Sequence, residues 1–111
     1  MFAARLADER LSVNRDPAFA SATALLRALR ARRIGSLELL DHYLARIARH
    51  NPAINAIVVT RIEAARKAAK ARDRASRSQA AVGLLHGLPM TVKESFDVTG
   101  LPSTWGTPAL R

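Results

Sequence analysis

The stretch of the chain that decides the fold is Gly83-Leu84-Leu85-His86-Gly87-Leu88-Pro89-Met90-Thr91-Val92-Lys93-Glu94-Ser95-Phe96-Asp97-Val98-Thr99-Gly100-Leu101-Pro102-Ser103-Thr104-Trp105-Gly106. Glycines and a proline at its start are typical of a loop, and the apolar run 90–92 predicts a short buried strand. Lys93 follows that run directly. An ammonium group at the end of a buried strand is costly unless it is paired, neutral or used in chemistry. Lysines also occur on strand edges, where their charge discourages stray pairing, so the residue types alone leave two interpretations of Lys93 open.

The whole stretch resembles the segment that carries the catalytic lysine in the amidase signature family, which has the form G-x-x-H-G-[ILV]-P-[MIV]-x-V-K-[DE]-x-[FIL]-x-V-x-G-[LMV]-x-[ST]-T. The positions of this chain that fall on the pattern are Gly83, His86, Gly87, Leu88, Pro89, Met90, Val92, Lys93, Glu94, Phe96, Val98, Gly100, Leu101, Ser103 and Thr104. Upstream, Asn51-Pro52-Ala53-Ile54-Asn55-Ala56 is similar to the N-P-x-x-N-A segment that the family places between a helix pair and a long alanine-rich helix.

The resemblance implies hydrolysis of the carbon–nitrogen bond of an amide by a Ser-Ser-Lys triad. Lys93 matches the family's lysine, which accepts the proton of the nucleophilic serine through a bridging serine and returns one to the leaving amine. That role needs a neutral amine near pH 7, whereas the pKa of a free lysine is about 10.4. We expect burial to lower the pKa of Lys93, because desolvation disfavours the charged form. The resemblance implies a small-molecule amide as substrate and no cofactor or metal; the substrate-binding residues stay unknown.

The neighbours of the lysine have lesser claims to a catalytic role. Pairing with Glu94 would hold Lys93 charged, but alternation along a strand predicts that the two side chains point to opposite faces. Most members of the family carry Asp at this position, so Glu94 is a mild departure. Neither Ser95 nor Ser103 lies in the glycine- and serine-rich motif that carries the family's nucleophile. The segment 103–106 is expected to line the site with hydroxyl groups or to cap a turn, and Trp105 is expected in the core.

No stretch of the 111 residues resembles the motif that carries the two serines, which comes later in the family. The expectation is therefore an N-terminal fragment of an amidase, truncated before that motif and inactive alone, because nucleophile, bridging serine and oxyanion donors are all missing. Strands predicted at 54–59 and 90–92 would lack neighbours in a sheet. Exposed edges of this kind pair wrongly, so low solubility or molten behaviour is expected.

Helices are predicted on both sides of the Asn-Pro segment. Apolar residues recur at helical spacing from Ala22, and either Ser21 or Thr23 can cap this first helix. Gly35 is expected to end it in the left-handed conformation. A second helix runs from a cap at Ser36 to about His50, where the residue before Pro52 is pushed out of helical space. A third helix over 61–78 is rich in alanine, Lys and Arg.

The order helix, helix, strand, helix, strand predicts an α/β fold, with helices packed on a mixed sheet that this chain contains only in part. Residues 1–20 are weakly patterned and are expected to form a loose N-terminal segment. Residues 21–111 are expected to form the N-terminal portion of one amidase domain.

The composition and the N-terminal sequence bear on the chemistry and the cellular location of the protein. The net charge is +9, from 18 Lys+Arg and 9 Asp+Glu, and there is no cysteine for a disulfide or a thiolate nucleophile. No apolar run approaches the ~20 residues that a membrane span needs. The N-terminus lacks a signal-peptide pattern, so a cytoplasmic protein without a membrane partner is expected. His42, His50 and His86 share no metal-ligand spacing.

Three alternatives remain open. The basic helix 61–78 and the +9 charge favour a nucleic-acid-binding module, although aromatic residues are few and no reading motif is present, so nucleic acid is not the expected partner. A catalytically dead domain that binds a protein partner is another alternative. Within the enzyme class, the resemblance also fits the family branch that releases ammonia from glutamine to amidate misacylated tRNA in a multisubunit complex. The oligomeric state cannot be derived from the residues.

Overall fold

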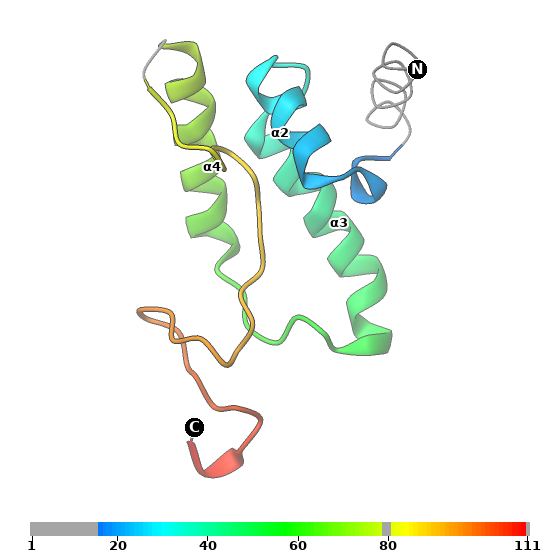
Figure 1. Ribbon diagram of the computed structural model, residues 1–111. Coiled ribbons are helices and arrows are strands. Elements are labelled where there is room, and N and C mark those ends of the chain that lie inside the picture. The colour runs from blue at the N-terminus through cyan, green and yellow to red at the C-terminus, as the bar shows by residue number, and fades with distance from the viewer. Residues whose placement is uncertain (1–15, 79–80, 111) are drawn as a thin grey trace.

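The computed structural model describes residues 16–78 and 81–110, and it is helical over that part of the chain (Figure 1). Its elements, in chain order, are the short 3-10 helix η1 (Pro17–Phe19), the helices α2 (Ala22–Arg30), α3 (Ser36–Ile54) and α4 (Ile62–Arg77), and the short 3-10 helix η2 (Pro108–Leu110). None of the described helices is long and apolar enough to cross a membrane.

The expected loose segment 1–20 lies mostly outside the described residues, but its last part is ordered. Asp16 caps η1 by accepting a hydrogen bond from the Ala18 N–H at 2.9 Å. The same carboxylate contacts α3, through His42 Nε2 at 2.8 Å and Arg46 Nη1 at 3.5 Å. These contacts attach η1 to the middle of α3.

Helix α2 begins where the sequence predicts. The Ser21 hydroxyl accepts from the Ala24 N–H at 3.2 Å, which satisfies one of the N–H groups that a helix start leaves unpaired. Its apolar face places Leu25 and Leu29 against Leu39 of α3, and these three leucines form the buried core cluster. Leu39 is completely buried.

The turn between α2 and α3 differs from the prediction. The left-handed residue is Arg32, with φ of 53°, and not Gly35, which is the N-cap of α3 with φ of −86°. The N–H groups of Arg33 and Arg32 donate to the carbonyls of Ala28 and Leu29, the paired bonds of a Schellman ending. The helix therefore ends earlier than the glycine suggests, because these bonds hold a non-glycine residue in the left-handed region.

Helix α3 continues past the expected stop at Asn51-Pro52 and ends at Ile54, with Pro52 inside its last turn. A proline this close to a helix end removes only one backbone hydrogen bond. The Asn51 side chain then fixes the chain beyond the helix. Its Oδ1 accepts a hydrogen bond from the Ile57 N–H at 2.8 Å, and its Nδ2 donates one to the Ile57 carbonyl at 2.9 Å. The left-handed residue that closes the helix is Asn55, with φ of 48°.

Helix α4 matches the helix predicted over 61–78 to within a residue at each end. It runs antiparallel to α3, and the connection 55–61 joins their ends (Figure 1). The Asp73 carboxylate of α4 accepts from the N–H groups of Ser36 and Leu37, at 2.6 and 3.2 Å. A carboxylate is favoured at a helix N-terminus, so this contact joins the first turn of α3 to α4. Arg66 of α4 adds an ion pair of 2.9 Å with Asp41 of α3.

The predicted strands are absent from the part of the chain that the structure describes, so the sheet of the predicted α/β fold is not found there. Ile54 belongs to α3, and residues 55–60 and 90–92 have no regular secondary structure. A strand takes its backbone hydrogen bonds from another segment, whereas a helix makes its own. The short β-branched stretches therefore do not become strands in these surroundings.

Candidate functional site

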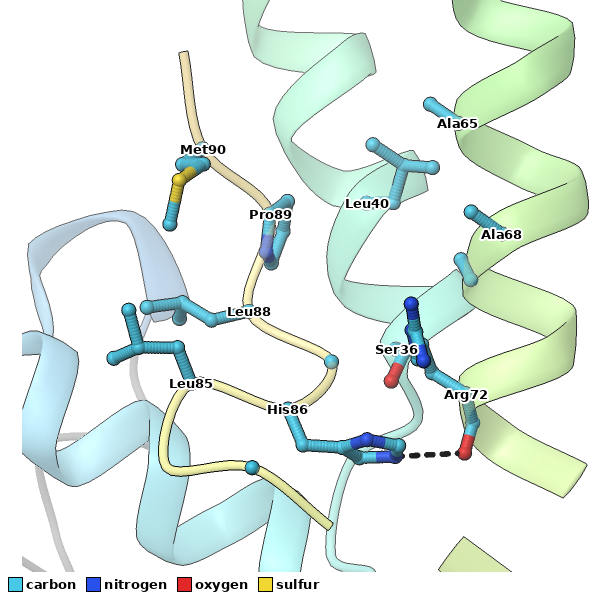
Figure 2. A pocket seen from close by; sticks show the side chains of 13 residues that line it. Ser36, Leu40, Ala65, Ala68, Arg72, Leu85, His86, Leu88, Pro89 and Met90 are labelled. Atoms are coloured by element: carbon cyan, nitrogen blue, oxygen red, sulfur yellow. Dashed lines mark hydrogen bonds between the residues drawn. The ribbon is translucent and has the colours of Figure 1, made fainter. Parts of the chain in front are cut away.

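The signature stretch lies across the helices and is fastened to them at its start. His86 Nε2 lies 3.0 Å from the carbonyl oxygen of Arg72 on α4 (Figure 2). It also lies 3.1 Å from the hydroxyl of Ser76 on the same helix. Because a carbonyl oxygen only accepts, Nε2 is the donor in the contact with Arg72. Arg30 of α2 also donates to the Leu84 carbonyl at 2.9 Å. Residues 84–86 are thus attached to both α2 and α4.

Gly87 marks the closest approach of the signature stretch to the helices. Its φ is +80°, and a Cβ placed there would clash with Oγ of Ser36, the buried first residue of α3. A side chain at this position would meet both steric strain and a clash. The next residue, Leu88, packs against the leucine core cluster. The glycine therefore lets the chain pass α3 closely enough for Leu88 to reach the core.

Lys93 lies further along, and its surroundings differ from the prediction. Its side chain is exposed, and its carbonyl accepts from the Phe96 N–H at 3.0 Å to form a turn. Burial at the end of a strand, which the sequence predicts, is not found. The reason is the missing sheet: among the described residues no strand lies beside 90–92 to cover the lysine.

Beyond the lysine, Glu94 closes a loop. Its carboxylate accepts from both the N–H and the hydroxyl of Thr104, and its carbonyl accepts from the Ser103 hydroxyl at 3.1 Å. Gly100, with φ of +78°, lies within this loop. The hydroxyl groups of Ser103 and Thr104 therefore stabilise a turn, one of the two roles expected for them. Trp105 does not enter the core, since 67% of its surface is exposed.

Two adjoining cavities lie between α3, α4 and the signature stretch, with volumes of about 490 and 600 Å³. The first is lined by Gly83 and residues 85–90 at the start of the stretch and is drawn in Figure 2. The second also reaches the connection between α3 and α4, through Ile57 and Thr60. The residues that both cavities share are Leu40, Ala65, Pro89 and Met90. We call the two together the groove; its walls are mainly apolar, and Lys93 lines neither part.

The carboxyl group of Asp16 and the hydroxyl group of Tyr43, a residue that lines the second cavity, both have altered pKa values. The Ala18 N–H, followed by His42, holds the pKa of Asp16 below its ordinary value. Burial raises the pKa of Tyr43, whose hydroxyl donates to the Pro17 carbonyl at 3.3 Å. Residues 16–78 and 81–110 contain no group of three His, Cys, Asp or Glu side chains placed to hold a metal ion.

Sequence reasoning missed the residues that position the signature stretch. It placed His86 in a loop, correctly, but considered it only as a metal ligand, and it assigned no role to Asp73. The contact of Asp73 could have been predicted in part, because a single acidic residue near the end of a basic helix indicates a hydrogen-bond donor on another segment. No pattern in the sequence indicates that Ser36 would be buried against Gly87.

Comparison with known proteins agrees with the family resemblance of the signature stretch. The amidase family matches residues 38–111. An indoleacetamide hydrolase from Bradyrhizobium diazoefficiens is 39% identical over 89 residues, which are 80% of this chain and 17% of that protein. A glutamyl-tRNA(Gln) amidotransferase subunit from Azoarcus sp. is 40% identical over 91 residues, 82% of this chain and 18% of that protein. An amidase from Pseudomonas putida is 37% identical over 81 residues, 73% of this chain and 17% of that protein.

The class that these matches define is that of enzymes acting on the carbon–nitrogen bonds of amides. This chain belongs to the amidase family. It spans less than a fifth of the length of the relatives named above.

Proposed function

We propose that this chain supplies the lysine of a Ser-Ser-Lys amide hydrolase and that Lys93 is its general base. The observation that carries the proposal is the position of Lys93 within a signature stretch that falls inside the family match. On one side of Lys93, Gly87 passes close to Ser36 of α3, and on the other side Glu94 is hydrogen-bonded to Thr104. These two contacts hold the backbone on either side of the lysine. The side chain itself is exposed and is therefore accessible to hydroxyl groups on other residues.

In this mechanism Lys93 acts as a neutral amine. It accepts the proton of the nucleophilic serine through a bridging serine while the nucleophile's oxygen forms a bond to the amide carbon. When the carbon–nitrogen bond breaks, the lysine's proton passes to the leaving amine. Water then hydrolyses the acyl-enzyme by the same route.

The substrate is proposed only as an amide. The relatives named for indoleacetamide hydrolysis and for glutamyl-tRNA(Gln) amidotransfer are 39% and 40% identical to this chain, so similarity does not separate the two activities. We also propose that the 111 residues alone leave amides intact, because no stretch of them matches the motif that carries the nucleophile. Purified chain with no turnover above background is the expected result.

A chimeric enzyme tests the role of Lys93. The matching 81-residue segment of the Pseudomonas putida amidase would be replaced by the corresponding residues of this chain. We expect the chimera to hydrolyse amides and Lys93→Met to lower kcat by about 10²- to 10⁴-fold, the range for loss of a general base. Lys93→Arg is expected to be equally inactive, because a guanidinium stays protonated.

Lys70→Met is the matched control, because Lys70 is an exposed lysine of α4 that lines neither part of the groove. We expect it to keep the activity of the parent chimera. Full activity of a folded Lys93→Met chimera, verified by its circular dichroism spectrum, would contradict the proposal.

A further inference from the structure

A line of four cationic side chains runs along the exposed side of α4. The four residues are Lys67, Lys70, Arg74 and Arg77, and all of them are exposed. Their spacing of three, four and three residues places them on one face of the helix. The line is about 15 Å long, because a helix rises by about 1.5 Å per residue. We call these four residues the basic ridge.

The charges of the basic ridge are not neutralised by the described residues. None of the four cations belongs to an ion pair within that part of the chain. The two acidic residues of α4 have other partners: Glu63 pairs with Arg66 at 3.5 Å, and Asp73 accepts hydrogen bonds from the first turn of α3. The ridge therefore presents four positive charges to an external anion.

The helix dipole accounts for only part of this arrangement. Cations are favoured at the C-terminal end of a helix, and Arg74 and Arg77 lie in the last turn of α4. The effect falls off within that turn, so it does not extend to Lys67 and Lys70 in the middle of the helix. Half of the ridge is therefore left without an explanation inside the fold.

The positive surface continues onto the turn between α2 and α3, which lies at the same end of the molecule as the C-terminal end of α4 (Figure 1). Arg32 of this turn lines a cavity of about 260 Å³ together with Arg77. Glu38 and Asp73 line the same cavity, but both carboxylates accept hydrogen bonds from backbone N–H groups. A fifth cation thus lies beside the end of the ridge.

The other exposed residues of α4 indicate which kind of polyanion fits. The helix contains no aromatic residue on which an unpaired base could stack, which disfavours single-stranded nucleic acid. Its exposed apolar residues are Ala64, Ala68 and Ala71, which offer too little apolar surface for insertion into a membrane interface. A nucleic-acid duplex carries about one negative charge per 1.7 Å of its axis and needs only cations opposite its phosphates.

We propose that the basic ridge binds the phosphate backbone of a nucleic-acid duplex without contacts that depend on base sequence. The cations of the ridge replace counterions condensed on the duplex, and release of those ions drives the binding. The net charge of +9 favours the encounter of the chain with any polyanion. Lys93 lies outside the ridge, so this binding does not depend on the proposed function.

Fluorescence anisotropy with a labelled DNA duplex of about 20 base pairs tests the proposal. We expect a dissociation constant of about 10⁻⁶ to 10⁻⁴ M near 0.15 M salt. The logarithm of the affinity should fall with the logarithm of the salt concentration with a slope of about −3 to −4, the value for four phosphate contacts. An RNA duplex of the same sequence should bind within about threefold, because the phosphates are shared. Absence of binding at low salt, or binding to only one of the two duplexes, would overturn the proposal.

Two double variants with the same change in net charge locate the binding surface. Lys70→Gln combined with Arg74→Gln should weaken binding by about tenfold or more and reduce the salt slope by about two. Arg49→Gln combined with Arg61→Gln is the control, since these exposed residues lie near the end of α3 and at the start of α4, away from the ridge. It should change the affinity by less than about threefold.

Circular dichroism should show unchanged helix in both double variants, because glutamine is about as favourable in a helix as lysine or arginine. Equal losses of affinity in the two would show that total charge, and not the ridge, determines binding. That result would overturn the proposal.

Two further probes separate a duplex from other anionic partners. Poly-glutamate, and vesicles that contain about 30% phosphatidylserine, should each bind at least about tenfold more weakly than the DNA duplex, because their charges are less closely spaced. Binding of poly-glutamate as tight as that of the duplex, and lost in the Lys70 and Arg74 double variant, would assign the ridge to an acidic polypeptide. The same result with vesicles would assign it to a membrane surface, and either would overturn the proposal.

Discussion

The helical layer, Ala22–Arg77, and the trailing segment, 81–110, differ in how their residues are held (Figure 1). The layer contains the leucine core cluster and the carboxylate contact between α3 and α4. The trailing segment is attached at a few points and exposes most of its large apolar side chains. Helices satisfy their own backbone, whereas strand-forming sequence depends on neighbours. The same chain therefore has a part that specifies its own structure and a part suited to completion by other residues.

The largest expected effect contrasts a leucine of the layer with one of the trailing segment. Leu39→Ala removes a completely buried side chain from the core and should destabilise the layer by about 2–5 kcal/mol. Leu84→Ala removes a side chain that is 80% exposed and should change stability by less than about 0.5 kcal/mol. Urea unfolding followed by circular dichroism measures both. Equal effects would show that the two regions do not differ as described.

The attachment of the two regions depends on Gly87. Gly87→Ala forces a left-handed alanine, at about 1–2 kcal/mol, and a clash with Ser36, at about 1–3 kcal/mol. We expect a loss of about 2–4 kcal/mol in the same urea experiment. Gly83→Ala is the matched control, because nothing lies within 4 Å of the added Cβ. A Gly87→Ala protein as stable as the control would show that this close approach does not form in solution.

Within the layer, Asp73→Ala tests the contact between α4 and the first turn of α3. The change leaves the N–H groups of Ser36 and Leu37 without their acceptor and should cost about 0.5–2 kcal/mol, the range for losing a helix cap. Asp73→Asn keeps a side-chain oxygen and should lose less. Thermal unfolding of the three proteins ranks them, and an alanine variant that melts with the parent would show that the contact does not stabilise the layer.

The smallest effect is a pH dependence at η1. The pKa of Asp16 is lowered in the folded chain, first by the Ala18 N–H and then by His42. Its contribution to stability is therefore complete above the ordinary value of 3.8 and is lost as pH falls through the lower folded value. Asp16→Asn should lower the urea midpoint slightly at pH 7 and make no difference at the acid end. A constant difference across the whole pH range would contradict this assignment.

The sequence predicted best what depends on nearby residues. The Ser21 cap, the leucines at helical spacing and the extent of α4 follow from local hydrogen bonding and periodicity, and all three are confirmed. The family was also predicted correctly from the signature stretch. The path of residues 81–92 nonetheless needed the structure, because their attachment through His86 and Gly87 joins positions far apart in the chain.

The errors have physical causes of two kinds. Two expected helix ends were misplaced. The left-handed residue after α2 is Arg32 and not Gly35, because the hydrogen bonds of a Schellman ending hold Arg32 in that region. Helix α3 continues through Pro52, which lies in its last turn. Strand rules failed at 54–59 and 90–92 because the necessary partners are not among the described residues. The exposure of Lys93, which follows the second of these stretches, has the same cause. Whether Lys93 is catalytic stays a prediction.

The hydrogen bonds from Asn51 to both backbone groups of Ile57 have a consequence for sheet register. In an extended chain the N–H and C=O of one residue point to one side, and those of the next point to the other. With both groups of Ile57 already occupied, an incoming strand would have to align with Val58 instead. Asn51, a single residue at the end of a helix, would thus select one strand register. It would exclude the register shifted by one residue, in which every side chain points to the opposite face.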